Sequence, residues 1–295
     1  MYLKLSKSEI RALRLLCAQD ASVGEMAARL KAKPSFASRI LAGLLAKDLV
    51  LAEKKGTTKI FRLSSASHAQ KFRQLSDSRP NAEIEEWLSG GAIDLLVVAN
   101  GGVEIDRLLE EASSSRATLY GLLRKMGAVG AAVVEKGTVR IPDSLVASFA
   151  EAYADNIQLL MQEDIRGINV SVRVRKHVIL RTDAKSVPNA FAETGVSALA
   201  KRGLEAFLTS YRDFYFNLDG KRRELSTEEC LVHAILLTSL RYNVDLTVLG
   251  LFFAKNARRL NLRLLKKLAK EYGVEGQLDG LRQKTEFYEK MRSFA

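Results

Sequence analysis

The sequence predicts a mainly α-helical fold with small β-sheets, arranged in three domains. The chain has 295 residues, and domains of roughly 100–200 residues are typical, so two or three are expected. Near the start, two Ser-x-x-Glu capping boxes precede helical patterns, and a similar pattern returns 82 positions later. From Gly167 the pattern changes to alternating strands and then helices. We therefore expect domains at residues 1–79, 80–165 and 166–295.

The composition argues against a membrane-spanning or disulfide-stabilised protein. The longest largely apolar run, Leu246–Ala254, has nine residues, whereas a bilayer-spanning helix needs about 20. The two cysteines, Cys17 and Cys230, cannot build a disulfide framework. Charged residues at the beginning of the chain are unlike a signal peptide. We expect a cytoplasmic protein with no membrane partner.

The net charge of +12 is distributed unevenly along the chain. Residues 1–79 carry +10, residues 80–165 carry −8, and the rest of the chain is again basic. A polyanion such as DNA would therefore be attracted mainly to the first segment.

Residues 1–64 have the pattern of three helices followed by a hairpin. Ser6 with Glu9 and Ser22 with Glu25 mark the starts of two helices. Pro34 is suited to the first turn of the third, which runs to about Lys47. Two strands, Val50–Glu53 and Lys59–Leu63, alternate around a turn containing Gly56. This order is that of a winged helix-turn-helix domain.

The second domain repeats this order. Apolar positions of the first segment fall on apolar positions of the second, as Met26 does on Leu108 and Leu44 on Met126. The second domain begins near Ile84, after the polar stretch Ser64–Asn81, in which Arg79-Pro80-Asn81 is interpreted as a linker. An amphipathic helix at about Ser144–Gln162 follows the second hairpin. It either forms a dimer seam or packs within its own chain.

The third domain is predicted to be mostly helical α+β. Ile168–Val174 and His177–Arg181 are expected strands, and Pro188–Gly203 an expected helix. The aromatic segment Phe207–Leu218 is expected to be extended. Further helices are expected after the capping box of Ser226 with Glu229, at Leu246–Lys255, at Asn261–Tyr272 with Gly273 as its stop, and at Gln277–Ser293.

The first domain resembles winged-helix transcriptional regulators of the MarR and ArsR type. The resemblance is carried by Gly24-Glu25-Met26-Ala27, by Ser35-Phe36-Ala37-Ser38-Arg39 and by Phe61-Arg62-Leu63-Ser64. The family usually has glycine where Asp48 stands, and in the second domain Gly130 occupies that place. The resemblance covers about residues 6–142 and implies a winged-helix fold for both domains. The third domain, through Thr194–Ala198 and Ser226–Leu231, is weakly similar to antitoxin-type regulators of the AbiEi sort and to archaeal multi-domain regulators.

A DNA-binding surface is expected on the first domain, because the third helix of such a fold enters the major groove. Arg39 is suited to a guanine edge and Phe36 to a thymine methyl, whereas lysines near the hairpin turn are suited to phosphate. The alternative is a solvated face without a partner. The residues expected to contact DNA are Lys33, Ser35, Phe36, Ser38, Arg39, Lys54, Lys55, Thr57, Thr58 and Lys59.

The second domain has a similar set within an acidic segment, and two interpretations stay open. It either makes a weaker DNA contact tethered by the first domain, or it contacts proteins. The residues concerned are Ser115, Arg116, Thr118, Tyr120, Arg124 and Lys136. A basic run in the third domain, from Arg258 to Lys270, is either a solvated helix face or a second nucleic-acid surface.

No pattern indicates an enzyme. The chain has no P-loop, no GxGxxG and no Cys-x-x-Cys, and its three histidines are isolated from one another in sequence. We expect no catalytic residue, no metal and no cofactor. The sequence thus favours a transcriptional regulator that binds double-stranded DNA, with a homodimer and a protein partner of the third domain also considered. An architectural duplex-binding protein and a protein-interaction scaffold are the alternatives.

Overall fold

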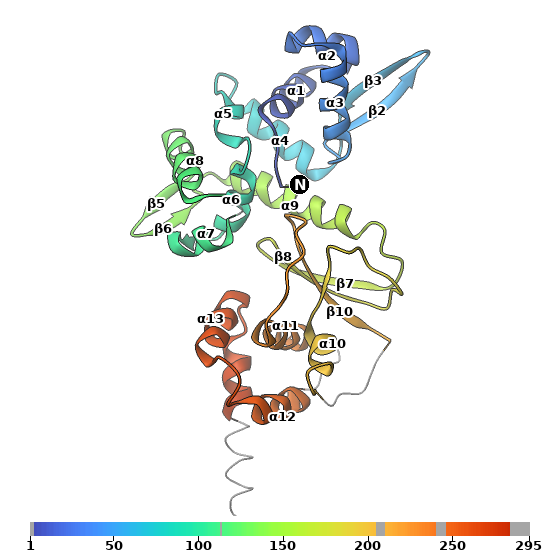
Figure 1. The fold of residues 1–295 in the computed structure, drawn as a ribbon. Coiled ribbons are helices and arrows are strands. Elements are labelled where there is room, and N and C mark those ends of the chain that lie inside the picture. Colours follow the sequence, from blue (N-terminus) through green and yellow to red (C-terminus); the bar gives the residue numbers. More distant parts are fainter. Residues whose placement is uncertain (1–2, 113, 205–209, 240–245, 284–295) are drawn as a thin grey trace, which may run out of the picture. The chain divides into compact units, whose positions relative to one another are not determined.

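The computed structural model describes residues 3–112, 114–204, 210–239 and 246–283, and the chain forms two compact units. Unit 1 spans Met1–Glu163 and unit 2 spans Asp164–Ala295. Both combine helices with small antiparallel sheets, and helix outweighs strand, as expected (Figure 1). Within the described ranges, no helix combines the length and the apolar character needed to cross a bilayer.

Unit 1 begins with the predicted sequence of helices and hairpin. Both capping boxes are confirmed: the Ser6 and Ser22 side chains accept from the amides of Glu9 and Glu25, whose carboxylates accept in return. Pro34 occupies the first turn of the third helix. The elements are α1 (Lys7–Ala18), α2 (Val23–Leu30), α3 (Pro34–Leu45), β2 (Val50–Lys55) and β3 (Thr58–Leu63).

A two-residue strand that the sequence analysis did not predict completes the first sheet. Strand β1 (Ala21–Ser22) pairs antiparallel with β3, placing Ala21 opposite Phe61. The strand order is β1-β3-β2. The short strand therefore ties the start of α2 to the hairpin.

A second segment of unit 1 has the same order of elements. Its strand order, β4-β6-β5, matches that of the first sheet, and β4 lies 82 positions after β1. Asp48 and Gly130, also 82 positions apart, both have positive φ, 58° and 69°. The elements are α6 (Ala92–Ala99), β4 (Val103–Glu104), α7 (Ile105–Glu111), α8 (Arg116–Ala128), β5 (Val133–Glu135) and β6 (Thr138–Arg140).

The polar stretch Ser64–Asn81 contains a helix that the sequence did not predict, α4 (Ser67–Asp77). The segment is polar in composition, but His68, Phe72 and Leu75 fall on one helical face and are buried. Arg79-Pro80-Asn81 does lie outside the helices and strands.

Helix α9 (Ser144–Gln162) packs against α4 and α6 and supplies much of the core of unit 1. Phe149 is fully buried, with its ring 5.6 Å from that of Phe72 and 5.8 Å from that of Tyr153. Leu159 on the same helix is 68% exposed. The apolar face of α9 is therefore occupied within its own unit, and the structure gives no support to a dimer seam.

Unit 2 contains a four-stranded antiparallel sheet of order β7-β8-β10-β9. The predicted helix over Pro188–Gly203 is mostly wrong: residues 192–193 form β9, and only Gly195–Ala200 (α10) is helical. Gly195 has φ +55°, and a Cβ there would lie 2.5 Å from the Asp213 carboxylate, so the strand ends and the helix begins at this glycine. The other strands are β7 (Asn169–Val174), β8 (His177–Thr182) and β10 (Arg212–Asn217).

Three helices, α11 (Thr227–Ser239), α12 (Leu246–Asn256) and α13 (Leu262–Tyr272), pack with the sheet around one apolar core. The capping box of Ser226 with Glu229 and the left-handed Gly273 at the end of α13 are confirmed. Residues 275–283 are helical, and the rest of the predicted helix to Ser293 lies outside the described residues.

A buried polar network crosses the core of unit 2. The Tyr215 ring stacks against His177 on one strand and against His233 on α11, with centroids 5.9 and 5.5 Å apart. The Tyr215 hydroxyl lies 2.7 Å from His177 Nδ1, and Thr194 Oγ1 lies 2.7 Å from His233 Nδ1. Burial, assisted by the charges of His177 and Arg223, lowers the pKa of His233 to about 3.

Replacing Phe149 by alanine should lower the free energy of unfolding by about 3–5 kcal/mol, because it opens a cavity between α9 and α4. The matched variant Leu159→Ala, on the exposed side of the same helix, should change it by less than about 0.5 kcal/mol. Chemical denaturation of both variants checks this. A large loss from Leu159→Ala with a small loss from Phe149→Ala would contradict the packing.

His233 should make unit 2 less stable as the pH falls below neutral. In the unfolded chain this histidine takes up a proton near pH 6.5, whereas in the folded chain its pKa is about 3. Its contribution to stability is present above pH 6.5 and is lost by up to about 1.4 kcal/mol per pH unit between these values. His233→Gln should reduce this slope, measured by denaturation at several pH values. Folded-state NMR showing His233 titrating near pH 6.5 would refute the assignment.

Candidate nucleic-acid interface

Helix α3 presents the predicted recognition residues on one exposed side. Its buried side is set by Ala37, Ile40, Leu41 and Leu44, which lie at helical spacing and pack into the core of unit 1. All five residues predicted on its start and outer face are exposed: Lys33, Ser35, Phe36, Ser38 and Arg39. The start of α3 is therefore free of packing against the described part of unit 1.

Phe36 and Arg39 interact on this side. They are one helical turn apart, and the Arg39 guanidinium lies 5.4 Å from the centre of the Phe36 ring, which is 37% exposed. A cation–π contact at such an exposed site is worth about 0.5–1 kcal/mol. The contact positions the guanidinium beside an exposed aromatic ring.

The β2–β3 hairpin forms a second basic element beside α3. Its last pair is Lys55 with Thr58, and Gly56 has φ +63°, which permits the tight turn. The hairpin projects away from the helices of unit 1, and β2 contacts α3 (Figure 1). The predicted hairpin residues are all exposed: Lys54, Lys55, Thr57, Thr58 and Lys59.

The cations of α1 are instead paired within unit 1. Helix α5 (Ile84–Leu88) places Glu85 against Arg11 and Arg14, at 2.9 and 3.3 Å, and Glu86 lies 2.5 Å from Lys7. The hydrogen bond from Lys7 lowers the pKa of Glu86. Burial opposes ionisation of Glu85, but hydrogen bonds from its own backbone amide and from Arg11 lower its pKa overall.

By contrast, the predicted cations at the start of α3 and around the hairpin turn have no carboxylate partner within the described ranges, whereas Arg62, farther along β3, pairs with Glu53. The cations without such a partner are Lys33, Arg39, Lys54, Lys55 and Lys59, although Lys59 lies over the Phe61 ring at 5.3 Å. Unneutralised positive charge is therefore present on both of the elements expected to face DNA, α3 and the hairpin.

The corresponding residues of the second segment are exposed but partly engaged. The Ser115 hydroxyl accepts from the Thr118 amide as the cap of α8 and lies 2.9 Å from the Thr118 hydroxyl. The Arg116 guanidinium lies 6.0 Å from the centre of the Tyr120 ring. Arg124 is exposed on α8, and Lys136 is exposed in the β5–β6 turn with φ 48°.

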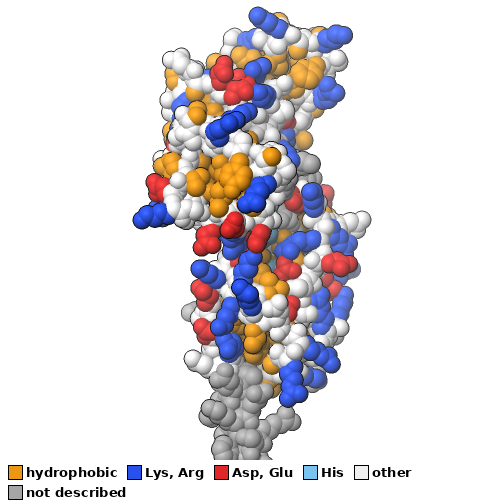
Figure 2. Space-filling view, turned by 60° about the vertical axis from the view of Figure 1, so that its left-hand side comes forward, with side chains coloured by type: hydrophobic (Ala, Val, Ile, Leu, Met, Phe, Trp, Pro, Cys, Tyr) orange, Lys and Arg blue, Asp and Glu red, His pale blue; other side chains and the backbone are white. Residues whose placement is uncertain are grey.

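The second segment also exposes apolar side chains. Tyr120, Val129 and Val134, from α8, the turn after it and β5, are 43%, 40% and 50% exposed. Figure 2 shows hydrophobic side chains gathered on the face of unit 1 where this segment comes forward. An exposed apolar patch is more typical of a protein contact than of a phosphate contact. Because the same segment also exposes Arg116, Arg124 and Lys136, both interpretations of this segment stay open.

Two cations near the interface were missed by the sequence analysis. Lys31 ends α2 with φ 52° and is exposed in the turn before α3. Arg62 is exposed on β3 but pairs with Glu53 at 2.6 Å. Lys31 could have been found from the sequence, because it lies in a turn two residues before Lys33. The pairing of Arg62 with Glu53 depends on the register of β2 and β3, which the sequence pattern does not predict.

A scan against protein-family models and a search of the curated proteins found no match to the chain. A functional assignment must therefore come from the residues of the interface themselves.

Proposed function

We propose that the chain is a DNA-binding transcriptional regulator that contacts duplex DNA through α3 and the β2–β3 hairpin of a winged helix-turn-helix domain. The observation that carries the proposal is the exposed and unneutralised charge of these two adjacent elements, in a segment whose other cations on α1 are paired with carboxylates.

Short polar side chains and one arginine at the start of α3 are suited to base edges in the major groove. Arg39 would form the bidentate contact with guanine, and Phe36 would contact a thymine methyl. The hairpin lysines would contact phosphates, which gives affinity without sequence preference. The matching strand order of the second segment supports a second winged helix that assists the first.

An architectural protein that binds duplex with little sequence preference is the second candidate. The lysines of the hairpin favour it, because phosphate contacts alone supply non-specific affinity. The two candidates differ in whether the residues of α3 distinguish base sequences.

Arg39→Ala should weaken binding to a preferred duplex by about 1–3 kcal/mol and relax the preference at one base position. The preferred sequence is obtained by selection from a random duplex pool with the full chain, and affinities are then measured on selected and scrambled duplexes. Arg166→Ala, at an exposed arginine outside unit 1, is the control and should leave both affinities unchanged. Equal losses on both duplexes would favour the architectural candidate.

The double variant Lys54→Ala/Lys55→Ala should weaken binding to all duplexes alike, because these side chains would contact phosphates. The slope of log affinity against log salt should become shallower by about one for each lysine. Lys54→Arg/Lys55→Arg preserves the charge and should retain most of the slope. An unchanged slope in the alanine variant would exclude the hairpin from the interface.

A further inference from the structure

The two sides of α13 have opposite chemical characters. The side that packs into the core of unit 2 is apolar and consists of Leu265, Leu268, Ala269 and Tyr272. The exposed side carries three cations, Arg263, Lys266 and Lys270. At about 100° and 1.5 Å per residue, these three positions fall within about 60° of one another and span about 10 Å along the helix. We call these three residues the basic stripe of α13.

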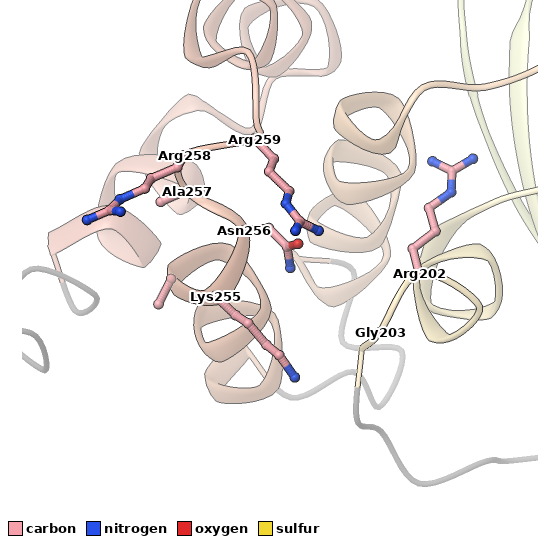
Figure 3. Close-up of a pocket in the computed structure, with 8 residues that line it drawn as sticks. Arg202, Gly203, Lys255, Asn256, Ala257, Arg258 and Arg259 are labelled. Carbon is pink, nitrogen blue, oxygen red and sulfur yellow. The ribbon is translucent and has the colours of Figure 1, made fainter.

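The predicted helix face covers only part of the basic run from Arg258 to Lys270, because α13 begins at Leu262. Arg258 and Arg259 lie in the turn between α12 and α13. Beside this turn lies a pocket of about 500 Å³, lined by Arg202–Gly203 and Ala254–Arg259. The Arg259 side chain extends into the space of the pocket, whereas the Arg258 side chain points away from it (Figure 3). The two arginines of the turn therefore do not act on one site, unlike the cations of the basic stripe.

No carboxylate neutralises the basic stripe among the residues that the structure describes, since none of its three cations forms an ion pair with them. The sequence of α13 contains one carboxylate, Glu271, which lies 4.0 Å from the Nε2 atom of His177. On another surface of unit 2, the exposed Lys201 does pair with a carboxylate, that of Glu193. The basic stripe thus leaves its positive charge available to a partner.

The stability of α13 does not explain this arrangement. Lys266 and Lys270 are four residues apart, and like charges at this spacing destabilise a helix slightly. Arg263 lies in the first turn, where the helix dipole disfavours a cation, whereas Lys270 lies in the last turn, where the dipole favours one. The basic stripe therefore includes interactions that are unfavourable for its own helix and that an anionic partner would offset.

We propose that the basic stripe of α13 contacts the phosphate backbone of duplex DNA and gives the chain a second DNA contact, one without base readout. Residues 166–295 carry a net charge of +10, which attracts a polyanion. Successive phosphates of one strand are about 3.4 Å apart along the axis of the duplex, so a stripe of about 10 Å is long enough to reach several of them. Arginine and lysine are both suited to phosphate oxygens.

An anionic membrane is a less suitable partner for the same charges. An amphipathic helix that binds a membrane surface inserts its apolar face between the lipids. The apolar face of α13 is instead buried in the core of unit 2. The charges of the basic stripe are therefore presented without the apolar surface that a membrane would take up.

The proposal goes beyond the contact of α3 and the hairpin and does not depend on it. When two DNA-binding surfaces belong to one chain, binding of either raises the effective concentration of the other. A contact with phosphates alone then adds affinity for every duplex alike.

Binding of the full chain to a random-sequence DNA duplex, measured at several salt concentrations, tests the proposal. The triple variant Arg263→Gln/Lys266→Gln/Lys270→Gln should weaken binding roughly tenfold or more near 0.1 M salt, and the slope of log affinity against log salt should become shallower by about two to three. The matched triple variant Arg166→Gln/Lys185→Gln/Lys221→Gln removes the same charge from other exposed positions of unit 2 and should have a much smaller effect.

Two further measurements separate the charge of the stripe from the folding of α13. The melting temperature of the α13 glutamine variant should be unchanged or higher, because the repulsion between like charges is removed. The variant Arg263→Lys/Lys266→Arg/Lys270→Arg preserves the charge and should retain most of the affinity and of the slope.

Equal effects of the two glutamine variants, or unchanged duplex binding by the α13 variant, would overturn the proposal. It would also be overturned if the α13 variant kept its duplex affinity but lost binding to vesicles containing phosphatidylserine, because the stripe would then contact a membrane. Lys54→Ala/Lys55→Ala, measured on the same duplex, tests the hairpin separately. A loss from that variant without a loss from the α13 variant would exclude the stripe and leave the proposal for unit 1 standing.

Discussion

Glu85 and Glu86 on α5 hold three cations of α1, and this pairing removes them from the positive charge of unit 1 that a partner could contact. Exposed ion pairs contribute little to stability individually, but Glu85 is only 10% exposed and binds two arginines. The acidic character of residues 80–165 is therefore partly used to dock α5 on α1. The net charges counted separately for residues 1–79 and 80–165 do not reveal this neutralisation, because each ion pair joins a cation of the first segment to a carboxylate of the second.

The packing of α9 against α4 and α6 gives the same unit its core. Because α4 lies between the two repeated segments and α9 follows the second hairpin, the two repeated segments share one apolar core. Division at residue 79 would expose the buried face of α4, including Phe72 and Leu75. The shared core also holds the buried face of α9, which leaves its opposite face, with Leu159, toward solvent.

Features that depend on neighbouring residues could be predicted from the sequence. The capping boxes, Pro34 at the start of α3 and Gly273 after α13 are local, and the structure confirms them. Strand β1 depends on a partner 40 positions away and has only two residues, so no alternating pattern reveals it. Helix α4 was missed because its buried histidine and three buried apolar residues lie within a polar composition. The exposed side of α3 could be predicted from periodicity, whereas the pairing of α1 and the pocket of unit 2 arise from contacts between distant segments.

Asp48 and Gly130 occupy equivalent turns after α3 and α8. Asp48 adopts the left-handed conformation at φ 58°, and Gly130 adopts nearly the same conformation at the equivalent position. Aspartate tolerates this region better than most residues, since its short side chain can bond locally, so Asp48 and Gly130 allow the same turn. The backbone geometry is thus kept in both segments while the outward residues differ, with Phe36 and Arg39 on α3 where α8 has Thr118 and Gly121. Each helix carries an exposed arginine beside an aromatic ring, but at different positions: Arg39 with Phe36 on α3, and Arg116 with Tyr120 on α8. This difference is what two copies with different partners, or with contacts of different strength, would require.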